Sequence, residues 1–117
     1  MCGVLSARGG TDNLLGVHCS RLFRLDLADY AAVRAALDET APDAIYHLAA
    51  RASVPAAWED PAACLQNNIL AQLNVLKAVT DAGARPRVLI VASADEYGRV
   101  QAQDLPVDED TPLRPVN

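Results

Sequence analysis

The fold is decided by residues 44–92, which read AIYHLAARASVPAAWEDPAACLQNNILAQLNVLKAVTDAGARPRVLIVA. Residues 44–48 form an apolar run typical of a buried strand, and residues 88–92 form a second one typical of a strand covered on both faces. Between them, Asp60 can cap a helix over residues 61–83 that has proline at its first position. Strand, helix and strand in this order predict two parallel strands joined by a crossover helix.

The same alternation continues on the N-terminal side of this unit. Residues 1–5 and 22–25 read as two further strands, with an irregular connection over residues 6–20. Asp29 can cap a helix over residues 30–40, because apolar residues recur there at three- and four-residue spacing. We therefore expect an α/β fold with a parallel sheet.

Three other segments carry expectations of their own. The helix over residues 61–83 has an apolar stripe, which we expect to pack against the sheet and which consists of Leu65, Ile69, Leu73 and Leu76. The small residues at 49–53 directly follow a predicted strand, at the carboxyl end where open α/β sheets bind ligands. Beyond Gly98 the sequence is polar and contains several prolines, which predicts a loop.

The composition excludes several classes of protein. Of the 117 residues, 51% are apolar and 21% are charged, which is ordinary for one globular domain. No apolar run approaches the roughly 18 residues that span a membrane, so we expect a soluble, cytoplasmic protein. The formal net charge of -5 argues against nucleic acid as a partner. The cysteines are widely spaced and the two histidines lie on different predicted elements, so no metal site is expected.

The sequence contains no stand-alone phosphate-binding motif. Gly3, Gly9 and Gly10 do not satisfy the G-x-G-x-x-G pattern. Lys77 is the single lysine beside nine arginines, and it follows Leu76 instead of the glycine that a P-loop requires. Any ligand site must therefore be built from other residues.

Six motifs nevertheless follow one another in a distinctive order. They are YHLAA at residues 46–50, SV at 53–54, WEDP at 58–61, Asn68, ASADEYG at 92–98 and PLRP at 112–115. This series resembles the NAD-dependent epimerase/dehydratase family, the nucleotide-sugar branch of the extended short-chain dehydrogenases. It looks most similar to the GDP-mannose 4,6-dehydratases and GDP-4-dehydro-6-deoxymannose reductases. The resemblance implies a Rossmann-like, doubly wound parallel sheet, an NAD(P) cofactor and a nucleoside-diphosphate sugar as substrate.

Parts of the family pattern have no counterpart in these residues. The family's first strand and its G-x-x-G-x-x-G turn would precede residue 1, and none of the three tyrosines is followed four residues later by lysine, as the catalytic Tyr-x-x-x-Lys requires. We therefore expect residues 1–117 to be an incomplete NAD(P)-binding domain without a substrate domain, inactive by itself, from a homo-oligomeric enzyme. A noncatalytic Rossmann-like remnant or interaction module and a 4-epimerase fragment are the alternatives.

The strand without a counterpart is the central one in the family's order 3-2-1-4-5. The strands at residues 1–5 and 44–48 would then lack their shared neighbour, and each would have an unpaired edge. Because such apolar edges pair between molecules, we expect the chain expressed alone to aggregate or stay molten.

The resemblance also assigns residues to the cofactor. Asp26 would accept a hydrogen bond from the adenine amino group and Leu27 would contact the ring, although a plain surface acid fits the same pattern. Small side chains at the strand ends would let the backbone approach the pyrophosphate and ribose. The alternative interpretation is that these side chains serve tight packing of the strands. The residues assigned there are Leu48, Ala49, Ala50, Arg51 and Ala92. Asn68 would have a structural role on the cofactor side, unless it is simply solvated.

Arg8 bears on the choice of dinucleotide. An acid at the end of the second family strand would hold the ribose of NAD, whereas residues 5–8 contain none and Arg8 could meet a 2′-phosphate. NADP is therefore the favoured cofactor, with NAD as the alternative.

Ser93 and Asp95 are the catalytic candidates. Ser93 precedes Tyr97 by four residues, like the family's Ser/Thr that donates a hydrogen bond to the sugar O4, although an inert cap at a strand end fits it too. Asp95 occupies the position at which the dehydratases carry a Glu that removes the C5 proton. Because Asp is one methylene shorter, reductase and epimerase chemistry stay open. In each case the resemblance implies hydride transfer at the sugar C4.

Overall fold

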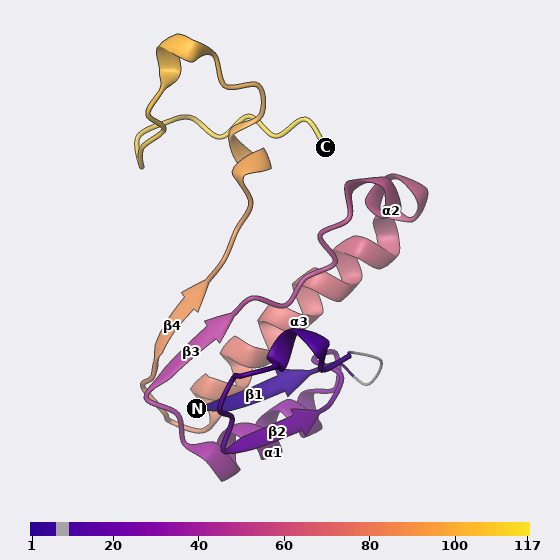
Figure 1. Ribbon diagram of the computed structural model, residues 1–117, viewed down its shortest axis with the longest axis vertical. Helices are drawn as coiled ribbons and strands as arrows, with labels where there is room; N and C mark the ends of the chain where they lie inside the picture. The colour runs from indigo at the N-terminus through magenta and orange to yellow at the C-terminus, as the bar shows by residue number, and fades with distance from the viewer. Residues whose placement is uncertain (7–9) are drawn as a thin grey trace.

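The computed structural model describes residues 1–6 and 10–117, in which strands and helices alternate (Figure 1). The strands are β1 (Cys2–Leu5), β2 (Arg21–Arg24), β3 (Ala44–His47) and β4 (Arg87–Ile90), and the α-helices are α1 (Tyr30–Thr40), α2 (Val54–Glu59) and α3 (Pro61–Asp81). Short 3-10 turns lie at Asp12–Leu14, Ala94–Tyr97 and Ala102–Asp104. The predicted strands and the two predicted helices are confirmed to within two residues at each end.

The strands form two separate parallel pairs. β1 pairs with β2, starting with Cys2 opposite Arg21, and β3 pairs with β4, starting with Ala44 opposite Arg87. Among the described strands, β1 and β3 each have one hydrogen-bonded partner, so that each keeps one unpaired edge. Figure 1 shows the two pairs side by side. This agrees with the expectation that these two strands lack a shared neighbour.

Both predicted helix caps are confirmed. The Asp29 carboxylate accepts a hydrogen bond from the Ala32 N–H at 3.1 Å, and the Asp60 carboxylate accepts one from the Ala63 N–H at 2.9 Å. Each bond satisfies an amide that has no partner within its helix. The two caps therefore determine where α1 and α3 begin.

The core lies between α1, α3 and the strands. Its buried centre is Val33 on α1 with Val75 and Ala78 on α3. Partly buried apolar side chains surround this centre, namely Leu25, Leu27, Tyr30, Leu37 and Ile45. The core therefore joins the two long helices to the ends of β2 and to β3.

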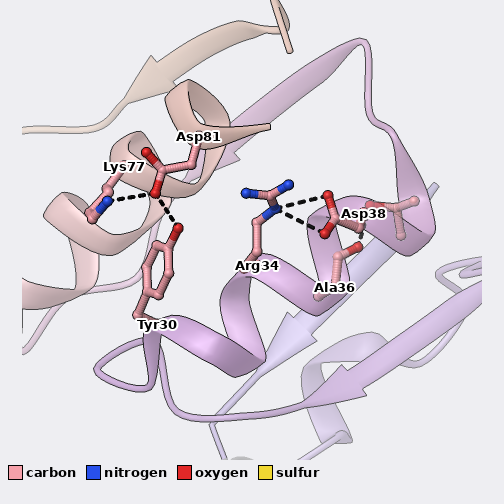
Figure 2. Close-up of polar contacts among 7 residues, drawn as sticks. Tyr30, Arg34, Ala36, Asp38, Lys77 and Asp81 are labelled. Atoms are coloured by element: carbon pink, nitrogen blue, oxygen red, sulfur yellow. Dashed lines mark hydrogen bonds and ion pairs between the residues drawn. The ribbon is translucent and has the colours of Figure 1, made fainter. Parts of the chain in front are cut away.

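Polar side chains also join α1 to α3 at the surface (Figure 2). The Tyr30 hydroxyl and the Lys77 ammonium both donate to the Asp81 carboxylate. The hydrogen bond from Lys77, and then that from Tyr30, hold the pKa of Asp81 below its ordinary value. On α1, Arg34 Nε donates to both carboxylate oxygens of Asp38 at 2.9 Å.

The predicted packing face of α3 is wrong. The stripe of leucine and isoleucine is exposed, from 61% for Leu65 and 59% for Ile69 to 37% for Leu76. The buried residues of α3 lie on the other face and are Cys64, Ala71, Asn74, Val75 and Ala78. The reason is steric, because small side chains let α3 approach α1 and the strands closely, whereas leucines at those positions would hold them apart.

The expectation that residues 44–48 and 88–92 are buried strands is also wrong. On β3 and in the segment after it, Tyr46 is 69% and Leu48 70% exposed. On β4 and just beyond it, Leu89 is 51% and Val91 55% exposed. In the described part of the chain α1 and α3 both lie on one face of the strands (Figure 1), so the other face is open.

Candidate functional site

The carboxyl ends of the strands open toward one side of the molecule. Figure 1 shows the arrows of both parallel pairs pointing the same way. The segments that follow β2, β3 and β4 contain the predicted site residues other than Arg8 and Asn68. Asn68 lies on α3, and Arg8 lies outside the described residues. This edge is where ligands bind in open α/β folds, and it is the candidate site.

The loop after β2 carries Asp26 and Leu27. Asp26 is exposed, and its Oδ1 accepts a hydrogen bond from the Ala28 N–H at 2.9 Å. Leu27 is half-buried and packs against the core. The loop is also bonded to α3, because Asn74 Nδ2 donates to the carbonyls of Leu27 and Ala28. Sequence reasoning missed Asn74, since a polar residue in a helix is expected on its solvent face.

The loop after β3 is held by Asn68. Asn68 Oδ1 accepts from the Arg51 N–H at 2.8 Å, and its Nδ2 donates to the Arg51 carbonyl at 3.3 Å. The Cys64 thiol donates to the same carbonyl at 3.5 Å. Asn68 is therefore engaged with backbone and is not simply solvated.

The residues of this loop are open to solvent. Leu48, Ala49, Ala50 and Arg51 are all exposed, so tight strand packing does not describe their environment. Small side chains on an exposed backbone let an extended ligand approach closely. The Asp26 carboxylate follows β2 in the neighbouring pair of strands, so the strand ends present exposed backbone and a carboxylate acceptor.

A short helix that sequence reasoning missed follows this loop. α2 (Val54–Glu59) begins at Ser53, whose hydroxyl accepts from the Ala56 N–H at 3.4 Å, and it has Pro55 in its first turn. Trp58 on α2 is 68% exposed. The N-cap serine followed by proline was the signal, but two turns of helix are too short for an apolar period to appear.

Ser93 and Asp95 lie at the end of β4, next to Ala92, and all three are exposed. Ser93 Oγ accepts from the Asp95 N–H at 3.2 Å and so caps the 3-10 turn. A hydroxyl that accepts one hydrogen bond can still donate its own hydrogen, so the cap leaves Ser93 able to act on a ligand. Asp95 Oδ2 accepts from Asn117 Nδ2 at 3.2 Å.

Two motifs that are far apart in the sequence meet beside Ser93. The Arg114 N–H donates to the Glu96 carbonyl at 2.8 Å. A Cβ on Gly98 would lie 2.0 Å from the Arg114 carbonyl oxygen, and Gly98 has a φ of 68°. Only glycine fits this turn, because the backbone of the PLRP motif crosses directly over it.

Other chemistry is limited in the described residues. His47 is 9% exposed, and burial lowers its pKa, so it is a neutral strand histidine at pH 7. No three metal-ligating side chains gather in the ranges 1–6 and 10–117. None of the helices described there is both long and apolar enough to cross a membrane.

A parallel α/β fold with exposed small residues, a carboxylate and a hydroxyl at the ends of its strands is typical of the Rossmann class of folds. A profile of the GDP-mannose 4,6 dehydratase family matches residues 9–117, and the chain belongs to that family. The expected family and the Rossmann-like fold are thus confirmed.

One curated sequence and two solved structures illustrate the likeness. The chain is 42% identical over 76 residues to the GDP-6-deoxy-D-mannose reductase of Pseudomonas aeruginosa, a match that covers 65% of this chain and 25% of the reductase. The structure of RMD from Pseudomonas aeruginosa complexed with NADPH has a TM-score of 0.75 and 32% identity, and covers 97% of this chain and 42% of that one. The UDP-glucose 4-epimerase of Thermus thermophilus in complex with NAD has a TM-score of 0.73 and 27% identity, over 98% of this chain and 45% of that one. The chain thus spans 25% of the curated relative.

Proposed function

We propose that the chain is the cofactor-binding part of an NAD(P)-dependent dehydratase or reductase that acts on a nucleoside-diphosphate sugar of the GDP-mannose type. The observation that carries the proposal is the pairing of the Asp26 loop and the Arg51 loop at one edge, each bonded to α3 by an asparagine. The likeness to the GDP-6-deoxy-D-mannose reductase supports the sugar class.

Each site residue has a role in this proposal. Asp26 accepts from the adenine amino group, Leu27 contacts the ring, and the exposed backbone from Leu48 to Arg51 lies beneath the ribose and pyrophosphate. Ser93 donates its hydroxyl hydrogen to the sugar and Ala92 leaves room beside it. The dinucleotide, when bound, supplies the hydride acceptor and donor at the sugar C4.

NADP is the dinucleotide that we propose. Arg8 is a suitable partner for a 2′-phosphate, and residues 5–8 contain no acid for a free ribose hydroxyl. Known structures support a nicotinamide dinucleotide in general, since RMD is complexed with NADPH and the Thermus thermophilus epimerase with NAD.

A 4-epimerase is the second candidate function. It is favoured by Asp95, whose carboxylate is shorter than the dehydratase glutamate and accepts a hydrogen bond from Asn117. The structural likeness to the UDP-glucose 4-epimerase is of the same quality as that to RMD, with TM-scores of 0.73 and 0.75.

The proposal includes a homo-oligomer in the cytoplasm. The exposed stripe on α3, made of Leu65, Ile69, Leu73 and Leu76, lies opposite the core face of the helix. An apolar row of this kind on a surface helix is a common feature of protein contacts, so it supports self-association.

The test uses the polypeptide translated from the complete natural reading frame, which this chain forms in whole or in part. We expect NADPH to bind, measured by nucleotide fluorescence, and Asp26→Asn to weaken binding about tenfold, because the amide keeps the Ala28 bond but loses the charge. Chromatography of GDP-mannose and UDP-glucose incubations then separates dehydratase, reductase and epimerase products. Failure of both NADPH and NADH to bind would overturn the proposal. Absence of G-x-x-G-x-x-G and Tyr-x-x-x-Lys from that frame would favour a noncatalytic remnant.

A further inference from the structure

Asn74 is a buried polar residue that the proposed function uses only as a bond between the Asp26 loop and α3, with no role of its own in cofactor affinity. It lies in the middle of α3 and is only 8% exposed. Its Nδ2 donates to two successive carbonyls, that of Leu27 at 2.8 Å and that of Ala28 at 2.9 Å. A buried amide with both hydrogens committed to backbone holds that backbone in one conformation, because release would leave donors and acceptors unpaired.

The two carbonyls belong to the loop that presents Asp26. The Ala28 N–H in turn donates to Asp26 Oδ1, and the Asp29 N–H donates to the Asp26 carbonyl at 3.0 Å. Asn74 therefore acts on the peptides next to Asp26 without touching its carboxylate. Any movement of the Ala28 peptide moves the orientation of that carboxylate as well.

The same helix holds the other loop of the site. Asn68 bonds the Arg51 peptide, and Asn74 bonds the loop after β2, less than two helical turns away along α3. α3 is anchored in the core by Val75 and Ala78, directly beside Asn74. One rigid helix thus sets the relative position of two loops that come from strand pairs without mutual hydrogen bonds.

We propose that Asn74 is the positioning residue for the adenine end of the cofactor: it holds the Asp26–Leu27 loop at the place where adenine is recognised. The inference rests on the proposed function, since it takes this loop as the adenine site. It predicts a residue that controls affinity for adenine nucleotides without contacting them.

The test measures binding of 5′-AMP and NADPH to the polypeptide from the complete reading frame. Asn74→Ala leaves space for water to reach the two carbonyls, and Asn74→Asp places a carboxylate against them. We expect Asn74→Ala to raise the Kd for both ligands about tenfold and to raise the KM for the dinucleotide with little change in kcat. Gln72→Ala, an exposed amide on the same helix, is the matched control and should change neither.

A double-mutant cycle with Asp26→Asn tests whether Asn74 acts through the loop. If it does, Asn74→Ala has little further effect on AMP binding once the Asp26 carboxylate is gone. Additive losses would overturn the positioning role, and so would unchanged AMP affinity in a folded Asn74→Ala protein. Failure of both Asn74 variants to fold would assign the residue to the core and would also overturn it. If the wild type binds no adenine nucleotide, the proposed function itself fails, and this inference fails with it.

Discussion

At the scale of single residues, the candidate site depends on asparagine side chains used as backbone clamps. An asparagine amide has the same donor and acceptor pair as a peptide group, so Asn68 can bond both the N–H and the C=O of Arg51. Asparagine is a poor helix former because its side chain competes for backbone groups. On α3 the Asn68 side chain instead bonds the backbone of the loop after β3, and so joins the helix to the end of that strand.

The first three predictions are made for the polypeptide from the complete reading frame, and the first of them concerns this clamp. Asn68→Ala removes both bonds to Arg51, and we expect the free energy of unfolding to fall by about 1–2 kcal/mol, measured by urea denaturation. Asn68→Asp keeps the acceptor but places a carboxylate oxygen against the Arg51 carbonyl, so its loss should be no smaller than that of Asn68→Ala. Asn67→Ala is the control, because Asn67 is exposed and bonds only the Asn68 side chain at 3.0 Å among the contacts described. Equal losses for Asn67→Ala and Asn68→Ala would argue against the clamp.

The second prediction concerns pH. Hydrogen bonds from Lys77 and Tyr30 hold the folded-state pKa of Asp81 below its ordinary value of 3.8. A carboxyl with a lowered pKa adds stability above its unfolded pKa, and this stability is lost as pH falls through its folded pKa. We therefore expect the urea midpoint of the wild type to fall more steeply than that of Asp81→Asn between about pH 5 and about pH 2. Lys77→Met should flatten the wild-type slope in part, and parallel slopes for all three proteins would contradict the prediction.

At the scale of elements, α3 has two apolar faces with different tasks. The inner face carries no side chain as large as leucine and fits closely against α1 and the strands, with Ala78 fully buried at 0% exposure. The outer face carries larger side chains, and Leu73 there is 52% exposed. Both faces contain apolar residues, so side-chain volume is what distinguishes the packing face from the free face.

The third prediction compares the two faces. Ala78→Leu inserts a large side chain where none fits, so we expect a loss of about 1–3 kcal/mol in the free energy of unfolding. Leu73→Ala should cost less than about 1 kcal/mol in a dilute sample, because the side chain is already half exposed. Sedimentation should show that Leu73→Ala also weakens self-association. A larger stability loss for Leu73→Ala than for Ala78→Leu would restore the outer stripe as the packing face.

At the scale of the whole molecule, the chain exposes more surface than its size requires. Its accessible surface is 8898 Å² at 12.4 kDa, whereas a compact monomer of this mass exposes about 6,100 Å². Its radius of gyration is 16.4 Å, against about 13 Å for a compact domain of this length. Figure 1 shows one reason, since the segment after β4 extends away from the strands and helices. The open sheet face and the unpaired edges of β1 and β3 add to it.

The fourth prediction follows from this excess surface. The 117-residue chain expressed alone should aggregate or bind a hydrophobic dye as a molten state, because its apolar edges and face are uncovered. It should also turn over no GDP-, UDP- or dTDP-sugar, since no tyrosine in it is followed four residues later by lysine. A monomer with a dispersed amide spectrum and one cooperative thermal transition would refute the first part, and NADP-dependent conversion would refute the second.

Local chemistry was enough to predict the order and type of most elements. Asp29 and Asp60 cap their helices through contacts three residues along the chain, and such contacts can be read from neighbouring letters. The apolar runs of β3 and β4, with a long predicted helix between them, left few arrangements other than parallel strands. The ordered motifs likewise identified the family, because they concern spacing and not packing.

The tertiary structure alone decided which faces and side chains meet. An apolar period shows that a helix has an apolar face. It favours Leu65 over Ala78 as a core residue because leucine is more hydrophobic, although only the smaller residue fits the core. The role of Asn74 depends on carbonyls 46 and 47 residues away in the sequence, and no local pattern contains that information. Burial of β3 and β4 depends on which side of the strands α1 and α3 cross, a property of the assembled fold that the letters of a strand do not specify.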